Sequence, residues 1–276
     1  MELGALERVE ACEEFVEGVA STDVRISDAV WVRIFRPQVI PSGKGDEEVA
    51  RPVILHVSVS YRLAPQHRLP AAYQDVALAV DWLVQQAKRQ QHEKECHPWL
   101  RSEFADFTNC FLAGESAGAA IVLKVARDAA EAGCLSSYIP LRIIGLLLVD
   151  PGFHSEQKRT SMVDEDLGMQ TNKLYDVALP EGETLDYPPV NPLHSSAPSL
   201  EPLSNYPHIL ITISDKDFRY DMTMEFYQRV NSFCSHVQLF VTADKGHVFH
   251  LFDPLSPQAE TLMLQLASFI QACTTR

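Results

Sequence analysis

Short apolar runs alternate with helical patterns along most of this chain. The runs have the length of buried strands, and the segments between or after them carry the spacing of apolar residues typical of helices. Strands followed by helices in this way predict a mostly parallel sheet covered by helices on both faces, the architecture of an α/β fold. The strands are expected at 23–26, 30–35, 52–61, 110–113, 143–149, 209–213 and 237–242, and the helices at 71–91, 116–132, 218–233 and 258–272.

Three segments depart from this alternation. Residues 152–206 are rich in proline, serine and acidic residues, and we expect them to form a small cap or lid inserted over the strand ends. Residues 38–51 contain glycines, a proline and consecutive acids, which indicates a solvated loop. Residues 1–20 have a weak helical pattern and remain unplaced. The whole chain, 1–276, is interpreted as a single domain.

Composition narrows the classes of partner. A net charge of −14 argues against nucleic acid and anionic membranes as partners. No apolar run approaches the roughly 20 residues of a membrane helix, and no signal peptide is visible. The six cysteines lack metal-type spacing and are typical of reduced thiols. We expect a cytoplasmic protein without metal or organic cofactor, and the pattern does not indicate an oligomeric state.

The segment Gly114-Glu115-Ser116-Ala117-Gly118 carries the first candidate chemistry. It lies between an apolar run and an alanine-rich helical pattern, so Ser116 is placed at a tight turn from strand to helix. A G-x-S-x-G in this context is typical of the nucleophile elbow of α/β-hydrolases. A chance glycine-rich and serine-rich turn is the alternative for the pentapeptide alone. The flanking strand and helix favour the elbow, with Ser116 as a nucleophile.

A nucleophilic serine needs a base and an acid that orients the base. The run 209–213 is followed by Asp215, Asp217 and Asp221, and the run 237–242 is followed by His247. Because the carboxyl ends of parallel strands share one edge of a sheet, these side chains are expected to meet Ser116 there.

Several residues compete for the two roles. We predict Asp217 as the acid, with Asp215 second, and Asp221 as a residue that opens or caps the following helix. His247 follows a glycine, as expected for a base at a loop tip. His250 is expected to pack or to face solvent.

Six segments carry a resemblance to a known family: GVASTDV at 18–24, YRLAP at 61–65, LPAAYQD at 69–75, LAGESAG at 112–118, NPL at 191–193 and GHVFHLF at 246–252. They resemble the plant carboxylesterases of the hormone-sensitive-lipase-like branch of α/β-hydrolases, a branch that includes the gibberellin receptors. The resemblance implies an α/β-hydrolase fold and hydrolysis of small carboxylic esters by Ser116, Asp217 and His247, with the Ala117 N–H in the oxyanion hole. It favours Asp217, since the family acid opens an Asp-x-x-x-Asp pattern. The gibberellin receptors lack the histidine that is present here as His247.

One family segment is missing. The family carries His-Gly-Gly-Gly after its third strand, and those glycine N–H groups supply half of the oxyanion hole. Here His56 is followed by Val57-Ser58-Val59-Ser60, without the glycines. The run 52–61 is therefore expected to form one strand where relatives have two, and the fold to have one strand and one helix fewer. Loss of an oxyanion donor costs about 10²–10³ in rate.

Three functional hypotheses follow from the sequence. The first is a serine carboxylesterase, with activity impaired by the missing glycines. The second is a receptor-like module that binds a small molecule with little turnover. The third is a shortened splice form or gene model that folds poorly. The acyl and alcohol preferences of an esterase are not indicated by the sequence.

Overall fold

A four-stranded parallel sheet forms the centre of the molecule. The computed structural model describes residues 9–38, 56–92, 94–160 and 173–274. All seven residues of β5 are buried, as expected for an inner strand covered on both faces. The parallel pairing of all neighbours confirms the predicted α/β architecture. The strands, in their order across the sheet, are β4 (Cys110–Glu115), β5 (Ile143–Val149), β6 (His208–Ser214) and β7 (Val237–Thr242).

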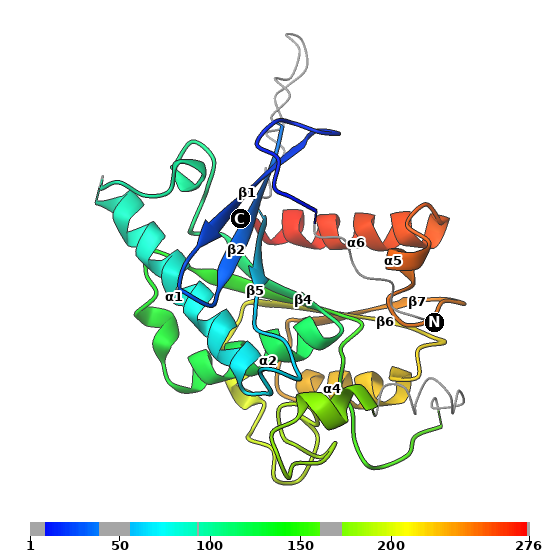
Figure 1. Ribbon diagram of the computed structural model, residues 1–276. Coiled ribbons are helices and arrows are strands. Elements are labelled where there is room, and N and C mark those ends of the chain that lie inside the picture. The colour runs from blue at the N-terminus through cyan, green and yellow to red at the C-terminus, as the bar shows by residue number, and fades with distance from the viewer. Residues whose placement is uncertain (1–8, 39–55, 93, 161–172, 275–276) are drawn as a thin grey trace.

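Helices cover both faces of this sheet (Figure 1). On one face, side chains of α1, α2 and α4 share a buried cluster with the sheet, to which Val80, Ala126 and Phe226 belong. On the other face, Phe269 of α6 packs with Ile144 and Leu210. The helices are α1 (Ala71–Gln91), α2 (Ala117–Glu131), α4 (Tyr220–Asn231), the short α5 (Phe249–Phe252) and α6 (Pro257–Thr274), with 3-10 turns at Pro98–Leu100, Cys134–Ser136 and Glu201–Asn205. None of the helices in the described ranges is both long and apolar enough to cross a membrane.

A second, antiparallel sheet lies at the N-terminal end, with β1 (Val19–Arg25), β2 (Trp31–Pro37) and β3 (His56–Ser60) in that order. Of the predicted strand 52–61, residues 56–60 are in β3, and 52–55 lie outside the described residues. Among the described strands, β3 pairs with β2 alone and β4 with β5 alone. The successive strands β3 and β4 therefore lie in different sheets.

Most element boundaries agree with the expected ones, and α1, β5 and β7 have the predicted bounds. The weak helical pattern of residues 1–20 was misleading in its described part. Residues 9–18 contain no helix, and Val16 forms an isolated antiparallel bridge with Val19. The predicted loop lies outside the described residues from residue 39 onward.

The segment expected to form a cap is largely irregular in its described part. Residues 173–178 are helical, and 161–172 lie outside the described residues. The helical turn contacts the loop that precedes α1, because Arg68 donates hydrogen bonds to the carbonyl oxygens of Asp176 and Leu179. Leu69 N–H also donates to Ala178 O. These contacts join the segment to the main fold, and its role as a lid stays a prediction.

Candidate active site

Ser116 lies at the turn between β4 and α2, in a backbone conformation that is rare for a residue with a side chain. Its φ is 50° and its ψ is −117°. A methyl group added at Gly114 would lie 2.2 Å from the carbonyl oxygen of Gly118, and one added at Gly152 would lie 2.7 Å from the carbonyl carbon of Ser116. The strand, the helix and the loop after β5 therefore meet closely around this serine. A methyl group at Gly118 itself would meet no atom within 4 Å.

The structure brings the three residues predicted from the sequence into one hydrogen-bonded chain. Ser116 Oγ lies 2.8 Å from His247 Nε2, and His247 Nδ1 lies 2.6 Å from Asp217 Oδ2. The other carboxylate oxygen of Asp217 accepts the backbone N–H of Arg219 at 2.8 Å. Asp217 is 1% exposed, so its orientation is fixed by these partners and by its own N–H, which donates to Ser214 O.

The competing residues lie elsewhere. Asp215 Oδ1 accepts the backbone N–H of Asp244, which ties two loops together. Asp221 lies in the first turn of α4. His250 is buried, and its Nε2 lies 2.5 Å from Glu115 Oε2. This hydrogen bond to Glu115 outweighs burial and raises the pKa of His250.

Asp150 is a site residue that the sequence reasoning missed. It follows β5 directly, so the strand-end rule that selected the other candidates applies to it as well. It is 1% exposed, and its Oδ2 accepts the backbone N–H of Val248 at 3.0 Å. A carboxylate oxygen of Asp150, a carboxylate oxygen of Asp217 and a ring nitrogen of His247 all lie within 4.8 Å of one another. Burial and the neighbouring charge of Asp217 raise the pKa of Asp150 to about 7.

Three residues with side chains have a positive φ at this site: Ser116 at 50°, Asp150 at 41° and Val248 at 46°. Each such residue costs of order 1–3 kcal/mol, and residues of this kind cluster at functional sites. The three lie on different loops, after β4, β5 and β7. Strain is therefore concentrated where the loops meet.

Ala117, the predicted oxyanion donor, lies at the N-terminus of α2. Ala117 is the first residue of α2, and the first N–H groups of a helix have no acceptor within it. The helix dipole adds to their preference for negative charge. The residues that follow His56, where the glycine segment of the family would begin, form β3 and pair with β2.

Tyr175 of the cap segment contacts the loop after β5. Tyr175 Oη donates to the carbonyl oxygen of Gly152 at 2.6 Å, and burial raises the pKa of Tyr175. The ring of Tyr175 meets the ring of His154 edge to face at 5.2 Å. Burial and the charges of Arg219 and Arg159 lower the pKa of His154 to about 4.

The sequence is similar to proteins of the α/β-hydrolase fold. A profile of the α/β-hydrolase fold family matches residues 48–251. "Probable carboxylesterase 2" of Arabidopsis thaliana is 31% identical over 79% of this chain and 65% of its own length. The 2-hydroxyisoflavanone dehydratase of Glycine max is 32% identical over 79% of this chain and 67% of its own. "Probable carboxylesterase 8" of Arabidopsis thaliana is 29% identical, with 66% of its length matched. The chain spans slightly less than two thirds of the two carboxylesterases.

Solved structures share the fold at low sequence identity. An esterase of Pseudomonas putida superposes with a TM-score of 0.71 at 18% identity, covering 94% of this chain and 85% of that one. An esterase of Mycobacterium marinum has a TM-score of 0.69 at 21% identity, covering 94% of this chain and 83% of that one. Together with the profile match, these similarities show that the chain belongs to the α/β-hydrolase fold family, in the group that contains the plant carboxylesterases.

Proposed function

We propose that this protein is a serine carboxylesterase that hydrolyses small carboxylic esters with Ser116, His247 and Asp217. The observation that carries the proposal is the hydrogen-bonded chain from Ser116 Oγ through the imidazole of His247 to the buried carboxylate of Asp217. The relatives named as carboxylesterases support the same reaction class.

The geometry suits acyl transfer in two steps. Ser116 Oγ attacks the ester carbonyl carbon while its proton passes to His247 Nε2, and the carbonyl oxygen becomes an oxyanion beside the Ala117 N–H. His247 then gives the proton to the departing alkoxide, which leaves an acyl group on Ser116. A water molecule attacks this acyl-enzyme, with His247 again accepting the proton. His247 returns this proton to Ser116 Oγ as the bond to the acyl group breaks, and the carboxylic acid leaves. Asp217 holds the imidazole in the tautomer with the proton on Nδ1 and stabilises the imidazolium.

A direct test uses the purified protein and a short-chain p-nitrophenyl ester. We expect turnover that Ser116→Ala abolishes, with a control variant, Ser137→Ala, at an exposed serine remote in sequence from the site. Turnover that survives Ser116→Ala would exclude this serine as the nucleophile.

The alternative of a receptor-like binding module is favoured by one observation. The position of the oxyanion glycines is taken by a strand, so only one of the two usual sets of N–H donors has a counterpart among the described residues. A fluorophosphonate probe separates the two functions because it labels only an activated serine. Labelling of Ser116 supports the esterase, whereas a small-molecule ligand that binds without labelling or turnover supports the module.

A further inference from the structure

We propose that Asp150 is a second positioning carboxylate for His247, which shares with Asp217 the task of holding and stabilising the imidazole. The proposal rests on the proposed role of His247 as the catalytic base. Asp150 lies outside the G-x-S-x-G motif and outside the turn that carries Ser116, so the proposal adds a residue to the predicted catalytic centre.

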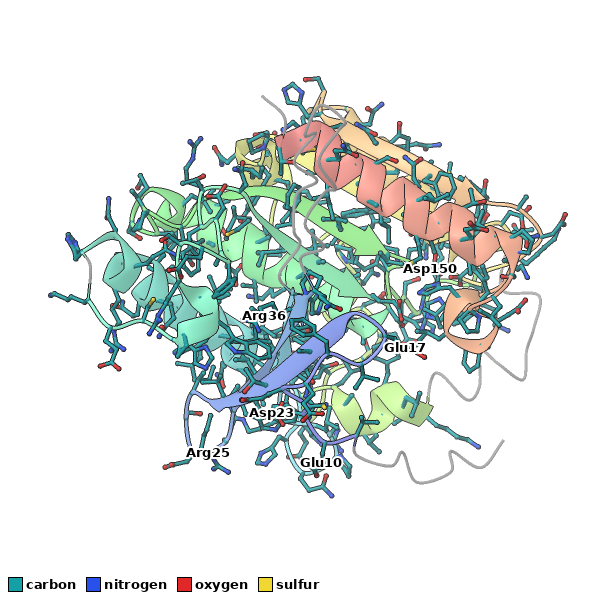
Figure 2. The ribbon with its side chains drawn as sticks, turned by 90° about the horizontal axis from the view of Figure 1, so that it is seen from above. Glu10, Glu17, Asp23, Arg25, Arg36 and Asp150 are labelled. Carbon is teal, nitrogen blue, oxygen red and sulfur yellow. The ribbon has the colours of Figure 1, made fainter. Side chains whose placement is uncertain are left out.

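The location of Asp150 supports this role. β5 lies between β4, which precedes Ser116, and β6, which precedes Asp217, so the loop after β5 opens between the nucleophile and the acid. Figure 2 shows Asp150 at the end of the sheet near α5, the short helix that follows His247. Its backbone N–H donates to Thr212 O of β6, which holds the strained residue against the sheet.

Asp150 reaches the histidine loop through two kinds of interaction. Its Oδ2 accepts the N–H of Val248, the residue directly after His247, at 3.0 Å. One of its oxygens also lies within 4.8 Å of a ring nitrogen of His247 and of an oxygen of Asp217. At that separation in a buried site, a negative charge on Asp150 stabilises an imidazolium, as the charge of Asp217 does.

The protonation of Asp150 is tied to its neighbours. Burial and the charges of Asp217 and Glu115 raise its pKa, and the Val248 N–H and His250 lower it, with a result of about 7. The carboxyl of Asp150 is therefore partly protonated at neutral pH. Removal of Asp217 removes one of the causes that raise the pKa of Asp150, while burial, the larger cause, remains. A larger share of Asp150 is then ionised at neutral pH, and this share supplies negative charge next to His247.

A purely structural role predicts a different outcome. If Asp150 only anchored the loop by accepting the N–H of Val248, Asn at this position would keep that role, since its side-chain oxygen can accept the same hydrogen bond. The effect of Asp150→Asn would then be the same whether or not Asp217 is present. A shared electrostatic role makes the two residues partly redundant, so the loss is larger when Asp217 is absent.

The experiment is a double-mutant cycle on the full chain. It compares the unmodified protein, Asp150→Asn, Asp217→Ala and the double variant. The readouts are kcat/KM for p-nitrophenyl acetate between pH 5 and 9 and the rate of fluorophosphonate labelling. We expect Asp150→Asn to lower kcat/KM about threefold alone and at least about thirtyfold in the Asp217→Ala background, a tenfold coupling. The acidic limb of the Asp217→Ala profile should change when Asp150 is replaced.

Controls keep the result interpretable. Asp215→Asn removes a nearby carboxylate that binds Asp244 instead, and we expect no additional loss from it in the Asp217→Ala background. Asp150→Ser also offers an acceptor to Val248 and serves as a second variant if Asp150→Asn does not fold. Equal factors in both backgrounds would overturn the proposal. If the unmodified protein neither turns over the ester nor reacts with the probe, the esterase function itself has failed, which is a separate outcome.

Discussion

At the scale of single residues, the two glycines of the nucleophile elbow are under different constraints. The backbone of Gly118 leaves no space for a side chain at Gly114, whereas Gly118 faces open space. The motif alone does not separate them, since both glycines belong to G-x-S-x-G. Only Gly114 is required by the close approach of β4 and α2.

This difference gives a matched pair of variants. We expect Gly114→Ala to lower the free energy of unfolding by about 3 kcal/mol or more, because a methyl group there overlaps backbone that cannot move without shifting α2. Gly118→Ala lies within α2 and should raise it by up to about 1 kcal/mol, since alanine favours helix. Urea unfolding of both variants measures the two effects. Equal destabilisation by the two substitutions would contradict this account of the elbow.

His154 should make the fold sensitive to acid. Its pKa in the folded protein, about 4, is below that of an unfolded histidine, because burial and the charges of Arg219 and Arg159 oppose protonation. Above pH 6.5 both states are neutral and the residue has no effect. As the pH falls from about 6.5 to 4, the unfolded state binds a proton that the folded state does not, and stability falls by up to about 3 kcal/mol.

His154→Gln should remove this dependence. We expect the unmodified protein to lose stability relative to this variant as the pH is lowered from 7 to 4. The difference between their free energies of unfolding is measured from urea unfolding at each pH. His92→Gln, at an exposed position at the end of α1, is the control. A difference that stays constant over this pH range would exclude His154 as the cause.

At the scale of elements, α1 is joined to the loop after β3 by an ion pair in which the carboxylate of Asp75 is buried and the guanidinium of Arg62 is partly exposed. Asp75 is 3% exposed and accepts hydrogen bonds from the backbone N–H, Nε and Nη2 of Arg62. Burial alone would raise the pKa of Asp75, but the hydrogen bonds and charge of Arg62 outweigh it, and the pKa is lowered. The contact fixes the start of α1 relative to the N-terminal sheet.

Asp75→Asn should therefore be costly. We expect it to lower the free energy of unfolding at pH 7 by more than the roughly 0.5 kcal/mol typical of a surface substitution, because Asn cannot pair with the Arg62 charge. Since the pKa of Asp75 is lowered in the folded state, its contribution is present above the unfolded pKa and lost as the pH falls through the folded one. Asp81→Asn, exposed on the same helix, is the matched control and should change stability little. Chemical unfolding at pH 7 and pH 3 compares the two variants, and a loss at Asp75 as small as that at Asp81 would refute the prediction.

The hydrophobic periodicity of the sequence predicted the helices and strands better than it predicted which strands pair with one another. α1, β5 and β7 were predicted with their bounds because their periodicity and punctuation are properties of neighbouring residues. Ser116, Asp217 and His247 could be placed together because each follows a parallel strand. Asp150 obeys the same rule, but the partner that shows its importance, Val248, is 98 residues away. The division of the strands into two sheets is also non-local, since it depends on which strand edges meet.

At the scale of the whole molecule, two sheets that share no hydrogen-bonded strand pair among the described residues still share one core. Ile34 of β2 is fully buried in the same cluster as residues of α1, α2, β5 and β6. Val57 and Val59 of β3 pack against this cluster. The connection between the sheets is therefore made by side chains and helices. Because the core is shared, we expect this chain, which lacks the glycine segment, to fold as one unit.

The shared core predicts one cooperative unfolding transition. Trp31 lies in β2, and its fluorescence reports on the N-terminal sheet. Trp82 and Trp99 also fluoresce, so the substitutions Trp82→Phe and Trp99→Phe are made to leave the Trp31 signal alone. Far-ultraviolet circular dichroism reports on the helices around the parallel sheet. We expect the two signals to give the same midpoint temperature of unfolding. The calorimetric enthalpy of unfolding should also equal the van't Hoff enthalpy. Ile34→Ala should cost about 2–5 kcal/mol and lower both midpoints together, because it leaves a cavity in the common core. If Ile34→Ala shifted only the tryptophan signal, the N-terminal sheet would be an independent unit, and the fold would tolerate the missing segment by separating into two parts.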